Sequence, residues 1–447
     1  MSDTIAAIAT SGIGAISIIR ISGTKAIEIT NKICDKNIVK KDSHTITYAH
    51  ITDGKEIIDE VLISIMKSPK SYTTEDVVEI NTHGGLAITN KVLELLLNNG
   101  CRLAEPGEFT KRAFLNGRID LLEAEGIMDL INSKTEKARK LAINTISGEV
   151  SNLIKNLRKE IIEVLANIEV NIDYPEYEDI EQVTNQMIKE KTKIIEETIK
   201  EILSKSKDGK IIKEGIKTII IGSPNVGKSS ILNRLLNEEK AIVTDIAGTT
   251  RDIVEGTIQI NGIVLNMIDT AGIRKTNDIV ESIGVKKSLD LINDADLILY
   301  VLNNNEKIKE EEKEILEKIK QKNHIVIVNK IDLENKLDLK EIEDFIEISI
   351  LNNIGIDNLK HKIVEMFNLE KLETNDYTYL SNARGISLLN KALDSLNQVR
   401  EGIEKDMPVD MIEIDLKEIW NILGEITGET YSDELIDQLF SQFCLGK

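Results

Sequence analysis

One octet, Gly222-Ser223-Pro224-Asn225-Val226-Gly227-Lys228-Ser229, has the pattern G-x-x-x-x-G-K-[ST] of a phosphate-binding loop. An apolar, β-branched run precedes it at 218–221, and helical spacing follows it at 230–236. Glycines in such a loop let backbone N–H groups approach phosphate oxygens at the start of a helix. We expect Lys228 to reach the β- and γ-phosphates and Ser229 to ligate Mg²⁺. The octet predicts a nucleotide-binding α/β domain.

A later motif indicates that the base is guanine. The apolar run 325–328 leads into Asn329-Lys330-Ile331-Asp332. Asp332 can accept hydrogen bonds from the ring N–H and the exocyclic amine of guanine, while Asn329 contacts the opposite edge. Adenine has the reverse pattern and would leave the carboxylate unpaired, which costs a few kcal/mol when it is buried. Ser349 is expected to begin the last guanine-contacting loop, although the residues after it differ from the usual Ser-Ala-Lys.

Two motifs between these complete the GTPase pattern. Residues 268–272 read Ile-Asp-Thr-Ala-Gly and supply Asp269, a carboxylate behind the metal. Residues 248–252 read Gly-Thr-Thr-Arg-Asp, where a threonine can complete the Mg²⁺ shell. Many GTPases have Gln directly after the glycine that corresponds to Gly272, where it orients the attacking water. This chain has Ile273 at that position. Another group must then position the water. Glu281 is close enough in sequence to do so, although the local sequence alone favours a solvated acid at a helix start.

Composition limits the other possibilities. The chain has 447 residues, enough for about three domains, with 41% hydrophobic and only 3% aromatic residues. A basic leader and a membrane-length apolar run are both missing, so we expect a cytoplasmic protein. Three widely spaced cysteines fit a reducing compartment and lack zinc-site spacing. The net charge of −20 argues against broad nucleic-acid binding, so any RNA contact should be local or shared with a partner.

The pattern changes along the chain. Up to residue 118, β-branched runs at 16–19, 61–65 and 77–80 alternate with helical stretches such as 86–97. Beyond it, apolar residues at steps of three and four predict one face of a long helix: Ile146, Val150, Leu153, Leu157, Ile161, Val164 and Ile168. We expect a break at 206–209, which reads Ser-Lys-Asp-Gly, and further helices at 386–399 and 411–440.

These patterns predict a multidomain α/β and α protein. Helical segments on both sides of the GTPase each carry an apolar stripe that needs cover, which favours one discontinuous bundle with a Ras-like P-loop domain inserted in it. The predicted domains are 1–118 (α+β), 119–211 (first helical part), 212–371 (GTPase) and 372–447 (second helical part).

The segment 443–447, Phe-Cys-Leu-Gly-Lys, also carries chemistry. Cys444 is placed as in a prenylation motif, but Gly446 and Lys447 break that pattern. Such a segment is often frayed. A thiol beside an amine could instead act as a nucleophile, a base or a ligand clamp.

Taken together, the chain resembles the tRNA-modification GTPases of the MnmE (TrmE) type over essentially its whole length. The marks outside the GTPase motifs are Ile-Ile-Arg-Ile-Ser-Gly at 18–23, Glu-Asp-Val-Val-Glu-Ile at 75–80, His-Gly-Gly at 83–85, Pro-Gly-Glu-Phe at 106–109, Arg-Ala-Phe-Leu-Asn-Gly at 112–117 and the segment 443–447. Leu445 stands where the family usually has Ile.

The resemblance implies a function for the first domain. It would be a dimerising, folate-binding-like module that holds 5-formyltetrahydrofolate or a related tetrahydrofolate. The positions matching the family's folate contacts are Arg20, Glu79, Arg118 and Lys447, with Arg118 replacing a lysine. By themselves, Arg20 and Glu79 favour an ordinary sheet-edge ion pair.

The resemblance also assigns the residues around GTP. Mg²⁺ would be held by Ser229 and Thr250, and K⁺ by Asn225, Thr244, Ile246 and Thr249, the K⁺ standing where other GTPases place an arginine finger. Glu281 matches the family's water-positioning residue. The implied nucleotide contacts are Asn225, Val226, Gly227, Lys228, Ser229, Ser230, Thr244, Asp245, Ile246, Ala247, Gly248, Thr249, Thr250, Asp269, Thr270, Ala271, Gly272, Asn329, Lys330 and Asp332.

The implied reaction adds an aminomethyl or carboxymethylaminomethyl group to C5 of the wobble uridine of certain tRNAs. The homodimer would work with an FAD-carrying flavoprotein, MnmG, in a heterotetramer. Cys444 is a candidate catalytic residue that would lie near the folate, where it either acts covalently on the base or only shapes the site. GTP hydrolysis would drive a conformational change. Two alternatives are a ribosome-assembly GTPase switch and a stand-alone folate enzyme with a regulatory GTPase domain. Neither accounts for both ends of the chain.

Overall fold

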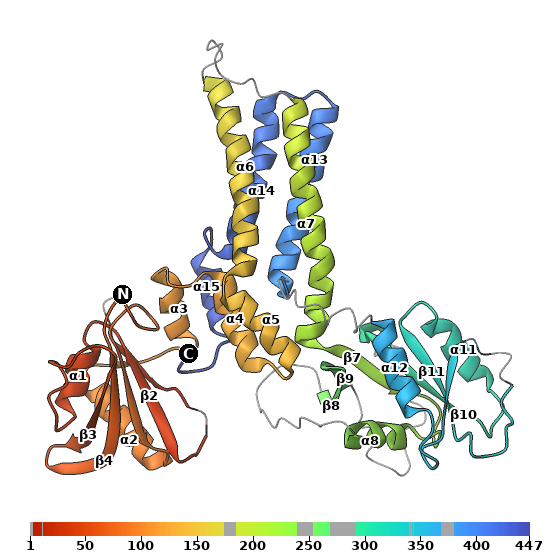
Figure 1. The fold of residues 1–447 in the computed structure, drawn as a ribbon, viewed down its shortest axis with the longest axis horizontal. Helices are drawn as coiled ribbons and strands as arrows, with labels where there is room; N and C mark the ends of the chain where they lie inside the picture. The colour runs from red at the N-terminus through yellow and green to blue at the C-terminus, as the bar shows by residue number, and fades with distance from the viewer. Residues whose placement is uncertain are drawn as a thin grey trace. The chain divides into compact units, whose positions relative to one another are not determined.

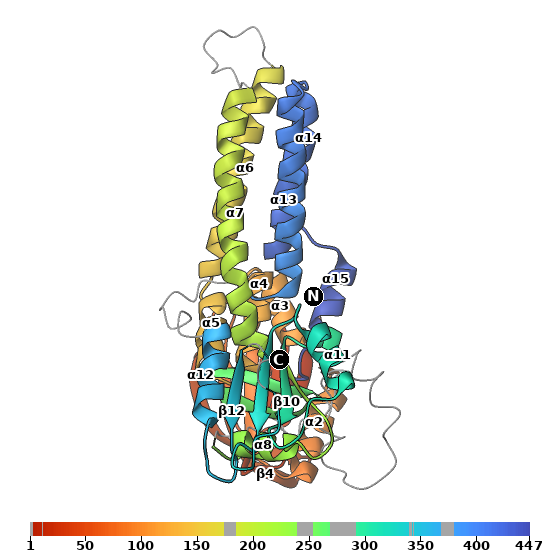
Figure 2. The same ribbon diagram turned by 90° about the vertical axis from the view of Figure 1, so that its right-hand side faces the viewer.

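The computed structural model describes residues 3–10, 12–173, 185–238, 254–268, 292–338, 342, 344–367 and 380–447 (Figures 1 and 2). The chain forms two compact units. Unit 1 comprises Met1–Met128, Thr145–Ile199 and Ser387–Lys447, and unit 2 comprises Asp129–Asn144 and Lys200–Ile386. The predicted domain boundaries stay a prediction.

Unit 1 contains a six-stranded mixed sheet in the order β3-β4-β5-β2-β1-β6. The strands are β1 (Ile5–Ile8), β2 (Ile16–Ser22), β3 (Thr45–Asp53), β4 (Glu56–Met66), β5 (Val77–His83) and β6 (Arg102–Leu103). Three of them contain the apolar runs expected to form strands, and α2 (Leu86–Asn98) is the helix expected at 86–97. Together with α1 (Ala26–Lys32), α2 packs against the sheet.

The two faces of this sheet differ. Alternate residues such as Ile19, Ile63 and Ile80 are fully buried beneath α1 and α2. The opposite face carries their sequence neighbours, because successive side chains of a strand point to opposite sides. One row of directly paired residues on this second face runs across four strands, through Ile46, Ser64, Glu79 and Arg20. The second face therefore presents both apolar and charged side chains.

Helices make up the rest of unit 1 and continue into unit 2. They are α3 (Glu108–Leu115), α4 (Leu121–Asn132), α5 (Glu136–Ile146), α6 (Glu149–Asp173), α7 (Asn185–Glu214), α13 (Ala383–Glu404), α14 (Val409–Thr427) and α15 (Asp433–Phe440). Within unit 1, parts of α6, α7, α13 and α14 lie side by side as a bundle (Figures 1 and 2). Lys417 of α14 pairs with Glu169 of α6 at 3.2 Å. Segments from before and after the GTPase thus share one bundle, which confirms the discontinuous helical domain.

Some details of the helical prediction were wrong. The predicted single stripe is split at Gly148, whose positive φ of 80° separates α5 from α6. Leu153 is exposed, and Ile154 is buried in its place. The break expected at 206–209 does not occur, since α7 runs through it to Glu214. Ser206 is buried there and its hydroxyl donates to the Ile202 carbonyl. Burial of the helix face outweighs the ~1 kcal/mol that a mid-helix glycine costs.

Unit 2 contains a second six-stranded sheet in the order β12-β11-β10-β7-β9-β8. Its strands are β7 (Ile216–Ile221), β8 (Val254–Ile260), β9 (Ile263–Ile268), β10 (Leu297–Asn303), β11 (His324–Asn329) and β12 (Phe345–Ile348). All neighbours pair in parallel except β8 with β9. The helices α8 (Lys228–Glu238) and α12 (Ile356–Met366) share one core cluster with the sheet, and α11 (Glu310–Ile319) shares another.

A sheet covered on both faces explains the apolar strands of unit 2. Every residue of β10 is buried, as is typical of a central parallel strand. The phosphate-loop octet begins directly after the neighbouring strand β7, at the carboxyl end of the sheet, where ligands bind in open α/β folds. None of the helices in the described ranges combines the length and apolar character that a membrane-spanning helix needs.

Candidate functional site

The octet 222–229 forms the predicted strand–loop–helix turn between β7 and α8. Gly222 has a φ of 150° and Gly227 a φ of 101°. A Cβ on Gly227 would lie 2.2 Å from Nδ2 of Asn329, and one on Gly222 would lie 2.3 Å from the Val301 carbonyl oxygen. Both positions therefore require glycine, because the backbone approaches its neighbours too closely for any side chain.

Three side chains donate hydrogen bonds to backbone carbonyl groups of this loop. Lys228 Nζ donates to the carbonyl oxygens of Gly222 and Ser223, both at 2.8 Å. Lys330 Nζ donates to Asn225 O at 2.7 Å, and Asn329 Nδ2 donates to Val226 O at 2.8 Å. With its carbonyls held in this way, the loop can direct N–H groups toward a phosphate. Burial lowers the pKa of Lys228, a cost that an anionic ligand would offset.

The residues predicted to contact guanine lie at the carboxyl end of β11 and in the loops beside it. Asn329 ends β11 and Asp332 follows it in the next loop. Ser349 Oγ donates to Asp332 Oδ1 at 2.5 Å, so Ser349 lies where the last guanine-contacting loop was expected. Within the described part of the chain, the buried Oδ1 of Asn329 has no hydrogen-bond partner. A buried orphan acceptor beside an oriented carboxylate fits a site completed by a ligand.

Several predicted residues lie outside the described residues, so their roles stay predictions. They are Thr244, Asp245, Ile246, Ala247, Gly248, Thr249, Thr250, Asp269, Thr270, Ala271, Gly272 and Glu281. Of the predicted Mg²⁺ and K⁺ ligands, only Ser229 and Asn225 are described. Asn225 has a φ of 59°, a left-handed conformation that asparagine tolerates better than most residues.

The second candidate site lies on the unit 1 sheet. Arg20 on β2 and Glu79 on β5 are directly paired, and their Nε and Oε1 atoms are 2.8 Å apart. The ion pair expected from the sequence is present, but on interior strands instead of at a sheet edge. Arg20 Nη1 also donates to the Gly446 carbonyl at 3.0 Å. The arginine therefore links the sheet to the segment 443–447.

That segment is held against the sheet module. Backbone N–H groups of Gly107 and Phe109 donate to the carbonyls of Cys444 at 3.3 Å and Lys447 at 3.1 Å. Gly446 has a φ of 88°, and a Cβ there would lie 2.6 Å from the Ile8 carbonyl oxygen. The segment is thus ordered and fitted between β1 and the start of α3. The segment 443–447 is therefore not frayed.

Charge and exposure in this site suit an anionic ligand. Burial, followed by the nearby Arg20 charge, lowers the pKa of Lys447. Two cations near each other in a partly buried place favour a negatively charged partner. Cys444 lies in the same segment and is exposed to solvent. Arg20, Glu79, Cys444 and Lys447 therefore come together.

Arg118 joins the site through an aromatic residue that the sequence reasoning missed. Its guanidinium carbon lies 4.6 Å from the ring centroid of Tyr72, and that of Arg20 lies 5.3 Å from the same ring. The Tyr72 hydroxyl is 2.9 Å from Thr110 Oγ1 on α3, which fixes the ring. Guanidinium groups stack on aromatic rings better than ammonium groups do, which suits arginine at position 118. Nothing in the local sequence around Tyr72 indicates this contact.

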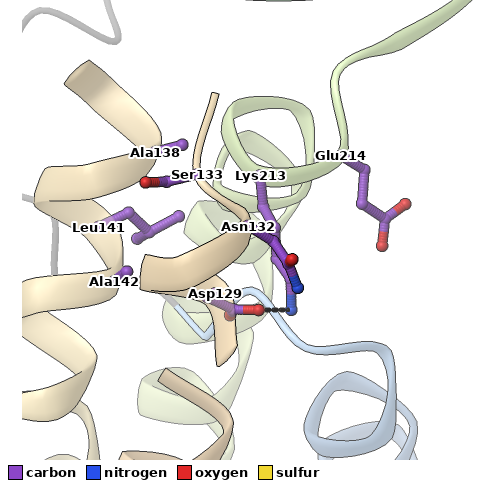
Figure 3. A pocket seen from close by; sticks show the side chains of 8 residues that line it. All are labelled: Asp129, Asn132, Ser133, Ala138, Leu141, Ala142, Lys213 and Glu214. Atoms are coloured by element: carbon purple, nitrogen blue, oxygen red, sulfur yellow. Dashed lines mark ion pairs between the residues drawn. The ribbon is translucent and has the colours of Figure 1, made fainter. Parts of the chain in front are cut away.

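Unit 2 also contains a cavity of about 160 Å³ away from the predicted residues (Figure 3). It lies where the ends of α4 and α7 meet α5, and its lining includes Asn132 and Leu141. Asp129 and Lys213 form an ion pair of 2.8 Å there. Burial raises the pKa of Asp129, and the Lys213 ammonium opposes that shift. The pair fastens the helices together at the point where the chain enters β7.

Comparison with known proteins gives matches along the whole chain. Residues 4–118 match the family model described as GTP-binding protein TrmE N-terminus, and residues 121–444 match the model described as MnmE helical domain. A Streptococcus thermophilus protein named tRNA modification GTPase MnmE is 54% identical over 449 residues, covering 100% of this chain and 98% of that protein. A Listeria welshimeri protein of the same name is 52% identical over 454 residues, covering 100% of this chain and 99% of that protein.

Proposed function

This chain belongs to the MnmE family of tRNA modification GTPases, and from that membership we propose its reaction. It is a GTPase involved in tRNA modification. We infer that, with a flavoprotein partner, it adds an aminomethyl or carboxymethylaminomethyl group to C5 of the wobble uridine of certain tRNAs. The observation that carries the proposal is that Arg20 and Glu79, on adjacent strands of the unit 1 sheet, lie beside the segment that contains Cys444 and Lys447.

The one-carbon donor we propose is 5-formyltetrahydrofolate or a related tetrahydrofolate. Arg20, Arg118 and Lys447 would hold its anionic groups, and Glu79 suits its pterin amine. When bound, it supplies the one-carbon unit. The fit is supported by the lowered pKa of Lys447, since a partly buried ammonium gains from an anionic neighbour. We assign Cys444 as the catalytic thiol of this site because it lies in the segment that Arg20 holds.

In the GTPase, we propose that Ser229 and Thr250 hold Mg²⁺, and that Asn225, Thr244, Ile246 and Thr249 hold K⁺. The metal ions would neutralise charge that develops on the phosphates. Ile273 cannot hydrogen-bond a water molecule, so we assign that task to Glu281. Hydrolysis would be accelerated when two GTPase domains associate across their nucleotides.

We propose that the protein acts in the cytoplasm with the FAD-carrying flavoprotein MnmG in a heterotetramer. A net charge of −20 leaves little cationic surface for tRNA phosphates, so the partner would provide most of the RNA-binding surface. This division of labour explains how so acidic a chain can serve an RNA substrate.

The open face of the unit 1 sheet supports the proposed homodimer. Ile46 and Tyr48 on β3 are 68% and 52% exposed, and Leu62, paired with Tyr48, is 47% exposed. These residues share the face that carries Arg20 and Glu79. Apolar clusters of this kind on a surface mark interaction sites, and we assign this one to a second copy of the chain.

Changing Leu62→Lys should weaken the dimer by at least about tenfold, because a charge would be buried at the interface. Light scattering across a dilution series measures the change. Leu86→Lys is the matched control, since Leu86 is 56% exposed and begins α2, which packs on the other side of the sheet. If Leu62→Lys dimerises like the unchanged protein, the interface lies elsewhere.

The proposed reaction is tested by mass analysis of wobble nucleosides in total tRNA from cells with and without this chain. We expect the aminomethyl-type uridines to disappear on deletion and to return with the intact gene. Unchanged nucleosides would contradict the proposal. Ribosome profiles from the same cells would then show whether the chain works in ribosome assembly instead.

A further inference from the structure

Glu312 is a buried carboxylate that belongs to none of the GTPase motifs. It lies in the first turn of α11 and is 7% exposed, whereas its neighbours Glu310 and Glu311 are exposed. Burying a carboxylate is costly unless hydrogen bonds satisfy it. Its position therefore needs a reason beyond the usual preference for acidic residues at a helix start.

The two oxygens of Glu312 have different partners. Oε2 accepts from the backbone N–H of Lys309 at 3.0 Å and thereby caps α11. Oε1 accepts from the hydroxyl of Ser223 at 2.5 Å. The first bond is enough to cap a helix. The second reaches across to the phosphate loop and gives α11 no additional cap.

Two further hydrogen bonds hold the backbone of Glu312 and the far side of the phosphate loop. The Tyr300 hydroxyl, on the fully buried β10, donates to the Glu312 carbonyl at 3.4 Å. Two residues after Ser223, the Asn225 carbonyl accepts from Lys330 Nζ at 2.7 Å. The segment 223–225 is thus held from α11 at one end and from the guanine-reading loop at the other. Between them, the chain turns into the left-handed φ of Asn225.

We propose that Glu312 is a positioning residue of the phosphate loop, acting through the Ser223 hydroxyl. It cannot help by charge, because a carboxylate repels phosphates. It helps by holding 223–225 in the shape that the nucleotide needs, so that less conformational freedom is lost on binding. The proposal rests on the assignment of 222–229 as the GTP loop and extends it to a residue on another element.

Nucleotide binding by the full-length protein tests the proposal. The affinity and dissociation rate of a fluorescent GDP derivative are measured for Ser223→Ala, Glu312→Ala and the double variant. We expect each single change to weaken GDP binding by about tenfold, the size of a lost hydrogen bond to a charged group. The double variant should bind no more weakly than Glu312→Ala, because both changes remove the same contact. KM for GTP should rise more than kcat falls.

Two further variants separate positioning from simple stability. Ser223→Thr keeps the hydroxyl and should bind GDP within about threefold of the unchanged protein. Glu311→Ala removes an exposed carboxylate from the same turn and should change neither binding nor melting temperature. If Glu312→Ala fails to fold, the Ser223→Ala and Ser223→Thr pair decides the question alone.

The proposal is overturned if Ser223→Ala binds GDP as tightly as the unchanged protein, even where Glu312→Ala lowers the melting temperature. That result would leave Glu312 as a helix cap only. It is also overturned if the two single effects multiply in the double variant. Failure of the unchanged protein to bind GDP would instead contradict the nucleotide site itself, which is a separate result.

Discussion

An Asp332→Asn variant is expected to lose GTP binding by at least about a thousandfold and to gain binding of xanthosine triphosphate. Ser349 Oγ donates to Asp332 Oδ1 at 2.5 Å, and an asparagine carbonyl can accept the same bond. The amide NH₂ would then point toward the base. Guanine offers an N–H and an amine there, so donor would face donor. Xanthine offers a carbonyl in place of the amine and can accept.

Calorimetric titration with GDP and xanthosine diphosphate measures this exchange, and hydrolysis of the two triphosphates provides a second reading. Asp357→Asn is a suitable control, because it makes the same chemical change at an exposed position on α12. A variant that keeps its affinity for GTP would show that Asp332 does not contact the base. Loss of both nucleotides would contradict the orientation argued from Ser349.

Gly446→Ala is expected to reduce wobble-uridine modification by roughly a hundredfold while leaving GTP hydrolysis intact. An added Cβ would meet the Ile8 carbonyl oxygen at 2.6 Å and the Ala9 Cα at 2.8 Å, and φ is 88°. A left-handed alanine costs about 1–2 kcal/mol, and a displaced segment also loses hydrogen bonds of about 1 kcal/mol each. A sum of about 3 kcal/mol shifts a population by about a hundredfold.

Nucleoside mass analysis of tRNA from complemented cells measures the Gly446→Ala effect, and GTP hydrolysis by the purified protein runs beside it. Leu445→Ile is the matched control, because Leu445 is 46% exposed and the change preserves its size. Modification at the unchanged level in Gly446→Ala would mean that the segment 443–447 is not needed in its observed place. A loss of GTP hydrolysis in the same variant would contradict a role confined to unit 1.

The sequence predicted those features that depend on neighbouring residues. The octet at 222–229 has its strand, its glycines and its helix within a few residues of one another, and all three formed as expected. The β-branched run at 16–19 also identified a real strand. Local signals misled where burial opposed them, as at Ser206 and at Leu153. Tertiary packing decides the conformation and burial of such residues, and local propensity carries no information about that packing.

Contacts between distant parts of the chain could not be predicted. Nothing near Glu312 distinguishes it from the rest of the chain's 76 acidic residues, because its importance comes from Ser223, 89 positions away. The same holds for Tyr72, which meets Arg118 only in the folded protein. The resemblance to a family identified both Arg20 and Lys447 as folate contacts. The structure adds that Arg20, on β2, hydrogen-bonds to the carbonyl of Gly446, in the same segment as Lys447.

The bond between Arg20 and Gly446 spans 426 positions and has a consequence for synthesis. Ribosomes add about 5–20 residues per second, so Arg20 is made roughly 20 to 90 seconds before Gly446. A chain that stops before residue 443 contains the residues of the strands and of the phosphate loop, yet its sheet site lacks the segment 443–447. The proposed chemistry on tRNA therefore cannot begin until translation has passed residue 446. Incomplete products could hydrolyse GTP without modifying RNA.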